Sequence, residues 1–368
     1  MNVSSVGKKI ALVLPDLRAG GAERVAIHLM RHFLAAGHRV EFVLMRKEGQ
    51  LLGDVPSDVP VIDLRAGRIR NAVCPLIRYL RRARPDAVQV SMWPLTVAAV
   101  LARALARSPA RLVISDHTLL SKHYAGNPRA LRLLKATMRI FYPWADARVI
   151  VADAAADDLA RLSGLKRDSL EVIYNPVFVP EAAVHPVAKV EAQWGEVDGR
   201  ILSVGSLKAE KNQALLIRSF ARVRQVRAAK LMILGSGELE QELKDLARSL
   251  GIGDDVQFAG FIADPWPYYA SADLFVLSSD YEGYPLVLVE AMMCGVPVVA
   301  TNCESGPREI LDSGRFGRLV PVDDEAALAN AMQAELEHPT ARDLLVERAK
   351  ELSGAGTVDR YLELLLGE

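Results

Sequence analysis

The sequence has few cysteines, and their positions exclude two classes of protein. Its 368 residues include Cys74, Cys294 and Cys303, which are scattered and form no CxxC pair. A structural zinc site or a disulfide framework needs cysteines clustered at short spacings. We therefore expect neither feature in this chain.

Long apolar runs and Asp-x-Asp pairs are also missing. The first apolar run, residues 10–14, is too short for a signal peptide, and no run approaches the length of a membrane span, about 20 residues. Without an Asp-x-Asp pair, the sequence does not require a divalent metal. These absences predict a cytoplasmic protein that works without a metal cofactor.

The chain has no net charge, but its charge is unevenly distributed. Residues 1–180 hold 27 Lys and Arg against 15 Asp and Glu, a balance of +12, and the remainder has a balance of −12. The basic half predicts an anionic partner, whereas the acidic half argues against a nucleic acid bound by the whole molecule. Two oppositely charged lobes facing each other across a cleft would explain the same distribution.

The length suits two domains, and the most informative stretch lies in the second half. Residues 274–277 form an apolar run that predicts a strand buried in a parallel sheet. A turn follows, and a helix is expected from Pro285, because proline suits the first helical position. Gly295 and Pro297 end that helix before a strand over residues 296–300.

Two carboxylates in this unit suit a sugar attached to a diphosphate. Glu282 in the turn and Glu290 in the helix could each accept hydrogen bonds from neighbouring sugar hydroxyls. Unpaired N–H groups and the helix dipole favour an anion at the start of the helix. The residues at that start are Gly283, Tyr284, Pro285 and Leu286. An ordinary amphipathic helix, on which Glu290 only caps or pairs, is the alternative.

This stretch resembles the retaining glycosyltransferases of family four. Glu282 and Glu290 are followed by GVPVVAT at residues 295–301 and GPREIL at 306–311, in the order and at the spacing of that family. The resemblance implies an α/β fold of the GT-B type, with two Rossmann-like domains facing a central cleft and a C-terminal helix returning to the first domain. It also implies that Glu282 is catalytic and contacts the donor sugar, and that Glu290 binds the nucleotide ribose.

The chain opens with a βαβ pattern of its own. Residues 9–14 predict a buried strand and residues 22–36 a helix, with Gly20 and Gly21 in the turn between them. Paired glycines permit a ligand to approach the backbone closely, although they also suit a purely structural turn. No GxGxxG fingerprint is present, which gives a nicotinamide cofactor little support. The turn is similar to the family's N-terminal loop, which faces the donor and acceptor.

A histidine follows a later strand of the first half. His117 comes directly after Asp116 and a short strand predicted over residues 112–115. A single histidine in such a place is commonly structural. The family has a histidine after this strand, close to the donor sugar and the acceptor. The resemblance therefore makes His117 the second catalytic candidate, and Asp116 stays outside the predicted site.

The second domain is expected to begin with a strand over residues 201–204. The following loop, residues 205–212, resembles the family's phosphate-binding loop, in which an arginine and a lysine hold the donor diphosphate. Lys211 matches the lysine, whereas Ser206 stands where the arginine often lies and offers no bidentate fork. Phe261 and Ile262 match the turn that holds the base in the family.

Four segments follow from these assignments. We predict a first, acceptor-binding domain over residues 1–176, a linker over 177–199 and a nucleotide-sugar-binding domain over 200–347. Residues 348–368 are expected to form the helix that packs back on the first domain.

The motifs together predict a transferase. Residues 305–309, SGPRE, resemble transferases of bacterial surface polysaccharides. Such an enzyme moves a hexose or N-acetylhexosamine from a nucleoside diphosphate sugar, here expected to be a UDP-sugar, to a glycan or lipid-linked glycan. Lys211, backbone N–H groups and helix dipoles would meet the phosphate charge without any cofactor. A nucleotide-sugar epimerase of the same fold and a non-catalytic sugar-binding protein are the alternatives.

A basic stripe on one predicted helix suggests where the enzyme works. The helix over residues 128–142 carries Arg129, Arg132, Lys135 and Arg139 at spacings that place them on one side. Each such side chain gains about 1 kcal/mol near an anionic leaflet. We expect peripheral attachment to the inner face of the cell membrane; a solvated helix face is the alternative.

Overall fold

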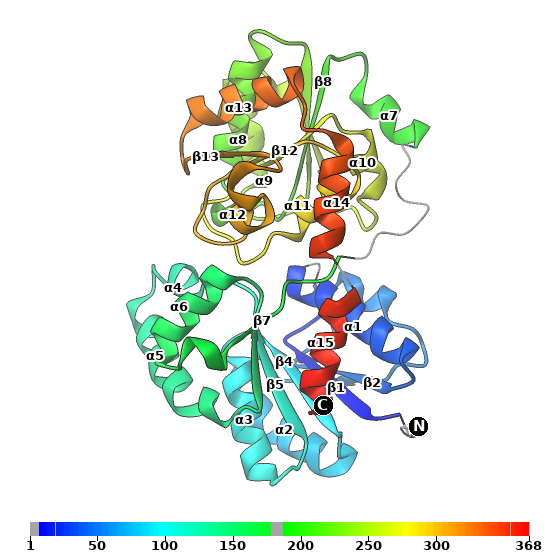
Figure 1. Cartoon of the computed structure of the whole chain (residues 1–368), viewed down its shortest axis with the longest axis vertical. Helices are drawn as coiled ribbons and strands as arrows, with labels where there is room; N and C mark the ends of the chain where they lie inside the picture. Colours follow the sequence, from blue (N-terminus) through cyan, green and yellow to red (C-terminus); the bar gives the residue numbers. More distant parts are fainter. Residues whose placement is uncertain (1–6, 19, 178–186, 354, 368) are drawn as a thin grey trace. The chain divides into compact units, whose positions relative to one another are not determined.

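The short apolar runs of the sequence form the strands of two parallel sheets. The computed structural model describes residues 7–18, 20–177, 187–353 and 355–367. Figure 1 shows its helices and strands. The chain divides into a first unit, Met1–Pro176 with Gly354–Glu368, and a second unit, Val177–Ser353. The predicted α/β class with two Rossmann-like domains is thereby confirmed.

The first unit has a seven-stranded sheet in the order β3-β2-β1-β4-β5-β6-β7, with every pair parallel. Its strands are β1 (Lys9–Leu14), β2 (Arg39–Leu44), β3 (Val61–Asp63), β4 (Ala87–Ser91), β5 (Arg111–Asp116), β6 (Ala147–Ile150) and β7 (Glu171–Val172). Its helices are α1 (Gly21–Ala35), α2 (Ile69–Ala83), α3 (Leu95–Ala106), α4 (Leu120–His123), α5 (Pro128–Phe141), α6 (Asp153–Ser163) and α15 (Ala355–Leu366). The strand order reverses between β1 and β4, and ligands of such sheets bind at that switch point, outside the carboxyl ends of the strands.

The second unit repeats this plan with a six-stranded parallel sheet in the order β10-β9-β8-β11-β12-β13. Its strands are β8 (Gly199–Val204), β9 (Ala229–Leu234), β10 (Val256–Gly260), β11 (Leu274–Leu277), β12 (Val298–Thr301) and β13 (Arg318–Val320). Its helices are α7 (Ala188–Trp194), α8 (Gln213–Arg224), α9 (Glu240–Ser249), α10 (Trp266–Ser271), α11 (Leu286–Met293), α12 (Pro307–Ile310), α13 (Glu325–Glu337) and α14 (Arg342–Leu352). Here the switch point lies between β8 and β11.

The inner strands read as continuous apolar runs because helices cover both faces of each sheet. All four residues of β11 are buried, as are all four of β12. In the second unit α8 and α13 pack together, and Phe220 and Met332 lie fully buried in the cluster they share. This rigid core holds the loops at the carboxyl edge of the sheet in place.

The predicted C-terminal helix is confirmed in part and corrected in part. Helix α15 packs against β4, β5 and α1 of the first unit (Figure 1). His32 Nε2 of α1 lies 2.9 Å from Asp359 Oδ1 of α15. The predicted segment 348–368 starts too early, however, because α14 ends at Leu352 and packs against α11 of the second unit. The guanidinium of Arg348 donates to the Glu309 and Ile310 carbonyls there.

The prediction of an irregular linker over residues 177–199 is wrong for its second half. Helix α7 begins at Ala188, and β8 begins at Gly199. Val190 and Trp194, one turn apart on α7, are buried, and Trp194 Nε1 donates to Ser271 Oγ at 2.9 Å. A small apolar face therefore makes this segment part of the second unit. Residues 178–186 of the predicted linker lie outside the described residues.

Candidate functional site

Two loops meet at the switch point of the second unit, because β8 and β11 are neighbours in its sheet. The loop after β8 ends in a short 3-10 turn, Ala209–Lys211, and the loop after β11 carries Glu282. Lys211 Nζ donates to Glu282 Oε1 at 2.5 Å. The structure thus brings together the lysine and the glutamate that the sequence predicted separately, 71 residues apart.

Backbone and side-chain contacts hold these two loops together. Ser278 Oγ donates to the Lys211 carbonyl at 3.0 Å, and the Asp280 N–H donates to the Glu210 carbonyl at 2.9 Å. Asn212, which also caps α8, donates from Nδ2 to Asp280 Oδ1 at 2.8 Å. The loops therefore form one connected edge that positions Lys211 beside Glu282.

Glu290 lies in α11 with 8% of its surface exposed. Its Oε2 accepts a 2.7 Å hydrogen bond from the hydroxyl of Tyr269, a fully buried residue of α10. The Tyr269 ring packs against those of Trp266 and Phe275. This support fixes the direction of a carboxylate on an otherwise apolar helix.

The start of α11 is a tightly built turn. Pro285 takes the cap position and Leu286 is the first helical residue, one place later than predicted. Ser305 Oγ donates to the Gly283 carbonyl at 2.8 Å. Gly306 has φ +84°, and a Cβ there would lie 2.4 Å from Pro285 Cδ, so the close approach requires glycine. Tyr284, between Gly283 and Pro285 in the chain, is 5% exposed.

The remaining predicted residues of the second unit line neighbouring strand ends. Ser206 follows β8 and is half-buried, and its carbonyl accepts from Gln213 Nε2 at 3.2 Å. Phe261 and Ile262 follow β10 and are half-buried. Gly235, after the intervening β9, leaves no room for a side chain, because a Cβ would lie 1.9 Å from the Gly205 carbonyl oxygen.

His117, Gly20 and Gly21 belong to the first unit. Gly20 caps α1 and Gly21 is its first residue, directly after the β1 loop. His117 follows β5, and its Nε2 lies 3.0 Å from Ser115 Oγ. A buried chain of hydrogen bonds continues from Ser115 to Gln89, whose Nε2 donates to Ser115 Oγ at 2.8 Å. The ring therefore has a defined orientation at the edge of the sheet.

Burial keeps the His117 imidazole neutral. It lowers the pKa of His117 to about 4, and the neighbouring Asn175 side chain offsets only part of this effect. A neutral imidazole at pH 7 can share a hydrogen bond with a sugar hydroxyl but supplies no positive charge.

Asp116, the residue before His117, has a structural role. The side chain is 2% exposed, and it accepts hydrogen bonds from the Tyr142 hydroxyl at 2.7 Å and the Trp93 N–H at 3.2 Å. Burial raises the pKa of Asp116 from 3.8 to about 6 against the effect of both hydrogen bonds. Asp116 thereby ties the β4 loop to the end of α5.

We expect the Asp116→Asn variant to reveal the cost of this buried charge. Since the folded-state pKa lies above the unfolded one, wild-type protein gains stability as pH falls through 6 toward 3.8, whereas asparagine does not titrate. The free energy of unfolding of wild type relative to the variant should rise by roughly 1 kcal/mol from pH 7 to pH 5. Urea denaturation measures this difference, and groups common to both proteins, including His117, cancel. A constant difference, or one of opposite sign, would contradict the assignment.

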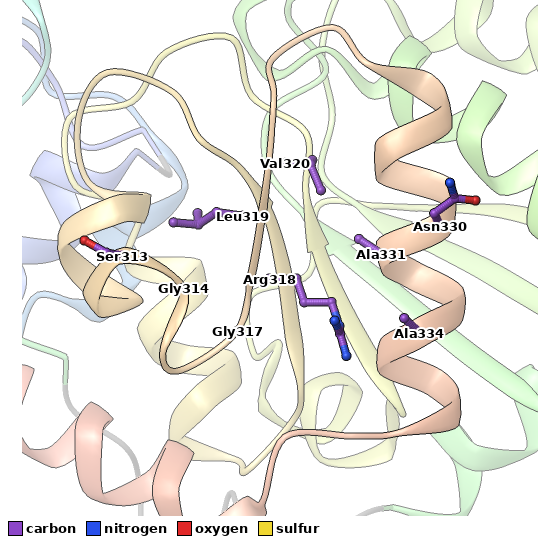
Figure 2. Close-up of a pocket in the computed structure, with 9 residues that line it drawn as sticks. All are labelled: Ser313, Gly314, Gly317, Arg318, Leu319, Val320, Asn330, Ala331 and Ala334. Carbon is purple, nitrogen blue, oxygen red and sulfur yellow. The ribbon is translucent and has the colours of Figure 1, made fainter.

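A pocket of about 500 Å³ lies elsewhere in the second unit. Figure 2 shows it between β13 and α13, with the Arg318 side chain extending beside α13. Arg318 Nε donates to the buried carboxylate of Glu335 at 2.7 Å. The pocket is lined by Ser313, Gly314, Gly317, Arg318, Leu319, Val320, Asn330, Ala331 and Ala334. None of the predicted site residues lines it.

Two features are absent from the part of the chain that the structure describes. No helix in this part is long and apolar enough to cross a membrane. In the same part of the chain, no three His, Cys, Asp or Glu side chains gather in a way that could hold a metal ion.

Sequence reasoning missed several residues that support the site. Ser279, Asn212 and Tyr269 each hold a predicted residue or its loop through a side-chain hydrogen bond. The sequence did give a signal for Ser279, which lies two residues after the apolar run of β11, and for Gln89 and Ser115, which are polar residues inside apolar strands. Nothing in the sequence indicated that Tyr269 reaches Glu290.

Comparison with known proteins gives matches along nearly the whole chain. The family described as "Glycosyltransferase Family 4" matches residues 19–179, and "Glycosyl transferases group 1" matches residues 188–352. A Campylobacter jejuni protein named N-acetylgalactosamine-N,N'-diacetylbacillosaminyl-diphospho-undecaprenol 4-alpha-N-acetylgalactosaminyltransferase is 28% identical over 352 residues, covering 93% of this chain and 94% of its own. The amylovoran biosynthesis glycosyltransferase AmsD of Erwinia amylovora is 28% identical, covering 83% of each chain.

Solved structures share the fold at lower identity. HepE of Anabaena, crystallised with UDP-glucose, matches with a TM-score of 0.81 and 22% identity, covering 98% of this chain and 99% of that one. A sucrose-phosphate synthase from Thermosynechococcus elongatus matches with a TM-score of 0.78 and 22% identity, covering 98% of this chain and all of that one. These similarities support the GT-B assignment of the fold.

Proposed function

The chain belongs to the family four glycosyltransferases, and from that premise we propose that it is a retaining transferase that uses a UDP-sugar. Its donor would carry a hexose or N-acetylhexosamine, and its acceptor would be a glycan or a lipid-linked glycan. The observation that carries this proposal is the contact of Lys211 with Glu282 at the switch point, beside the start of α11. This contact supports the proposal because it pairs a cation suited to phosphate with a carboxylate suited to sugar hydroxyls.

The donor roles divide along the sheet edge. Lys211 and the N–H groups at the start of α11 would bind the diphosphate, and Glu282 would hold the sugar. Glu290, fixed by Tyr269, would bind the ribose, and the turn at Phe261 and Ile262 would hold the base. His117 in the first unit would contact the sugar or the acceptor as a neutral imidazole.

With Glu282 assigned to the sugar hydroxyls and Glu290 to the ribose, the proposed site assigns no carboxylate as a nucleophile at the anomeric carbon. We propose front-face attack, in which the leaving phosphate helps to deprotonate the acceptor hydroxyl and the product keeps the donor's anomeric configuration. Phosphate charge would be met by Lys211 and backbone N–H groups, so excess chelator should leave the rate unchanged.

A panel of nucleotides tests the donor class. UDP at a hundred times its dissociation constant should stabilise the protein by about 2.7 kcal/mol, which a thermal shift detects. GDP and ADP at the same concentration should give smaller shifts. A larger shift with either of them would replace UDP in this proposal, and no shift with any nucleotide would contradict the donor class.

The names of two Campylobacter jejuni relatives place their acceptors on undecaprenol diphosphate, which supports a lipid-linked acceptor here. Such an acceptor would lie at the inner face of the membrane, and α5 of the first unit would suit that surface. Its four basic residues, Arg129, Arg132, Lys135 and Arg139, are all exposed. Within the described residues, none of the four forms an ion pair.

Exposed apolar side chains lie on α5 and just beyond it, near these basic residues. Leu133 is 57% exposed and Ile140 55%, and Trp144, just beyond α5, is 51% exposed, whereas Leu134 and Met138 are buried in the core. Leu133 and Ile140 are seven residues apart and share one face of the helix. Cations beside exposed Leu, Ile and Trp suit the headgroup layer of an anionic bilayer better than water.

We expect this helix to bind anionic vesicles. Changing Arg132, Lys135 and Arg139 together to glutamine should weaken binding by about 3 kcal/mol at low salt, since each contributes about 1 kcal/mol. Changing Leu133 and Ile140 to serine should weaken it further, whereas Leu105→Ser, an equally exposed control at the end of α3, should not. Co-sedimentation measures these effects. Protein that ignores anionic vesicles even at low salt would contradict membrane docking and favour a soluble acceptor.

A further inference from the structure

Two hydrogen-bond donors share one oxygen of Glu282. Its Oε1 accepts from Lys211 Nζ at 2.5 Å and from Ser279 Oγ at 2.6 Å. The glutamate is 7% exposed and Ser279 is fully buried. A buried carboxylate is costly without hydrogen-bond partners, and here the structure provides a charged partner, Lys211, and a neutral one, Ser279.

The two donors differ in how firmly they are held. Ser279 lies two residues after β11, and its carbonyl accepts a 2.5 Å hydrogen bond from the hydroxyl of Thr301, a fully buried residue at the end of β12. Its short side chain has one rotatable bond. The Lys211 side chain is 23% exposed, and its four-carbon stem can turn. The serine is therefore the fixed partner of Glu282, and the lysine is the movable one.

We propose that Ser279 is a positioning residue that holds Glu282 in place when Lys211 leaves it for the donor diphosphate. This inference rests on the proposed function, in which both Lys211 and Glu282 face the donor. A diphosphate carries more negative charge than one carboxylate and attracts the ammonium more strongly. Glu282 then keeps its hydrogen bond from Ser279, and hydroxyls of the donor sugar replace the lysine.

A series of Ser279 variants tests this role. We expect Ser279→Ala to lower kcat for sugar transfer by about 10- to 100-fold, the loss that one hydrogen bond to a charged group produces, with the Kd for UDP changed less than about twofold. Ser279→Thr retains the hydroxyl and should recover most of kcat. Ser279→Cys keeps the size with a weak donor and should fall between alanine and wild type.

Ser219→Ala provides a matched control. Ser219 is a fully buried serine of α8 whose hydroxyl donates to the Glu325 carbonyl at 3.1 Å, so its loss also removes one buried hydrogen bond. Ser219→Ala should lower the melting temperature about as much as Ser279→Ala does, and it should leave kcat unchanged.

A second readout tests the movement of Lys211. If Glu282 competes with the diphosphate for the lysine, Glu282→Gln should bind UDP at least about threefold more tightly than wild type and uridine equally well, as weakening the ion pair frees the ammonium. The gain should vanish when Lys211→Ala is combined with it. A gain that persists without Lys211 would mean simple repulsion and would overturn the exchange.

The outcomes separate this inference from the proposed function. Wild-type protein that binds no UDP would contradict the proposed function itself. Wild-type protein that transfers sugar, with Ser279→Ala retaining its kcat, would overturn only the role of Ser279. Equal losses of kcat and UDP affinity in Ser279→Ala would reduce that role to structural support and would also overturn the inference.

Discussion

Glu282→Ala should lower kcat for sugar transfer by about 100- to 1,000-fold, the range observed when an enzyme loses one group that stabilises charge in the transition state. The reason is that Glu282 lies at the sheet edge beside Lys211, where it can hold the hydroxyls of the reacting sugar. UDP contains no sugar at this position, so the Kd for UDP should not rise. Steady-state kinetics and calorimetric titration measure the two effects.

Glu290→Ala is the matched comparison, because it removes a second buried carboxylate from the same unit. If Glu290 holds the ribose, this variant should weaken UDP binding by roughly 1–3 kcal/mol, the value of a hydrogen bond to a charged group, and change kcat much less. Small and equal losses in both variants, with the fold intact by circular dichroism, would rule out this division of roles.

Lys211→Ala should weaken UDP binding by about 2–3 kcal/mol, since it removes a charge-assisted hydrogen bond to the diphosphate. Uridine has no phosphate, and its affinity should change less than about twofold for the same reason. Lys208→Ala, an exposed lysine three residues earlier in the same loop, should have a smaller effect. If UDP and uridine weakened alike, the loop would not contact the diphosphate.

The same loop offers a gain-of-affinity experiment. Ser206 lies in the loop after β8, and β8 is the strand next to β11. The family often has an arginine at the position of Ser206. Ser206→Arg should tighten UDP binding and leave uridine binding unchanged, because a guanidinium can bind phosphate through two parallel hydrogen bonds. An equal change for both ligands would place Ser206 away from the phosphates.

Much of the fold followed from local sequence because parallel strands in a covered sheet must be apolar. The run over residues 274–277 is β11, and the strand predicted over 296–300 is β12, shifted to Val298–Thr301 since Pro297 cannot donate to the ladder. Helix α2 begins at Ile69 and includes Pro75, although a proline inside a helix removes a backbone hydrogen bond and usually ends it. Packing against α3 outweighs the local preference there.

The sequence allowed single site residues to be predicted, but it did not show which of them contact one another. Motif spacing pointed to Lys211 and Glu282, but their contact depends on β8 and β11 being neighbours, which follows only from the strand order. The hydrogen bond from Tyr269 to Glu290 and the one from Ser279 to Glu282 required side-chain positions. On α5, helical periodicity predicted the basic stripe, whereas the exposure of Leu133 and Ile140 depends on which face packs on the unit.

A transfer assay is the most direct test of the proposal that this chain is a retaining glycosyltransferase. The protein should be incubated with UDP-hexose or UDP-N-acetylhexosamine donors, with and without an undecaprenyl diphosphate-linked glycan, and both UDP release and acceptor mass should be followed. We expect UDP release that depends on the acceptor, an acceptor heavier by one sugar residue, and a new linkage with the anomeric configuration of the donor. UDP released equally without acceptor, with no gain in acceptor mass, would contradict a transferase and indicate an epimerase.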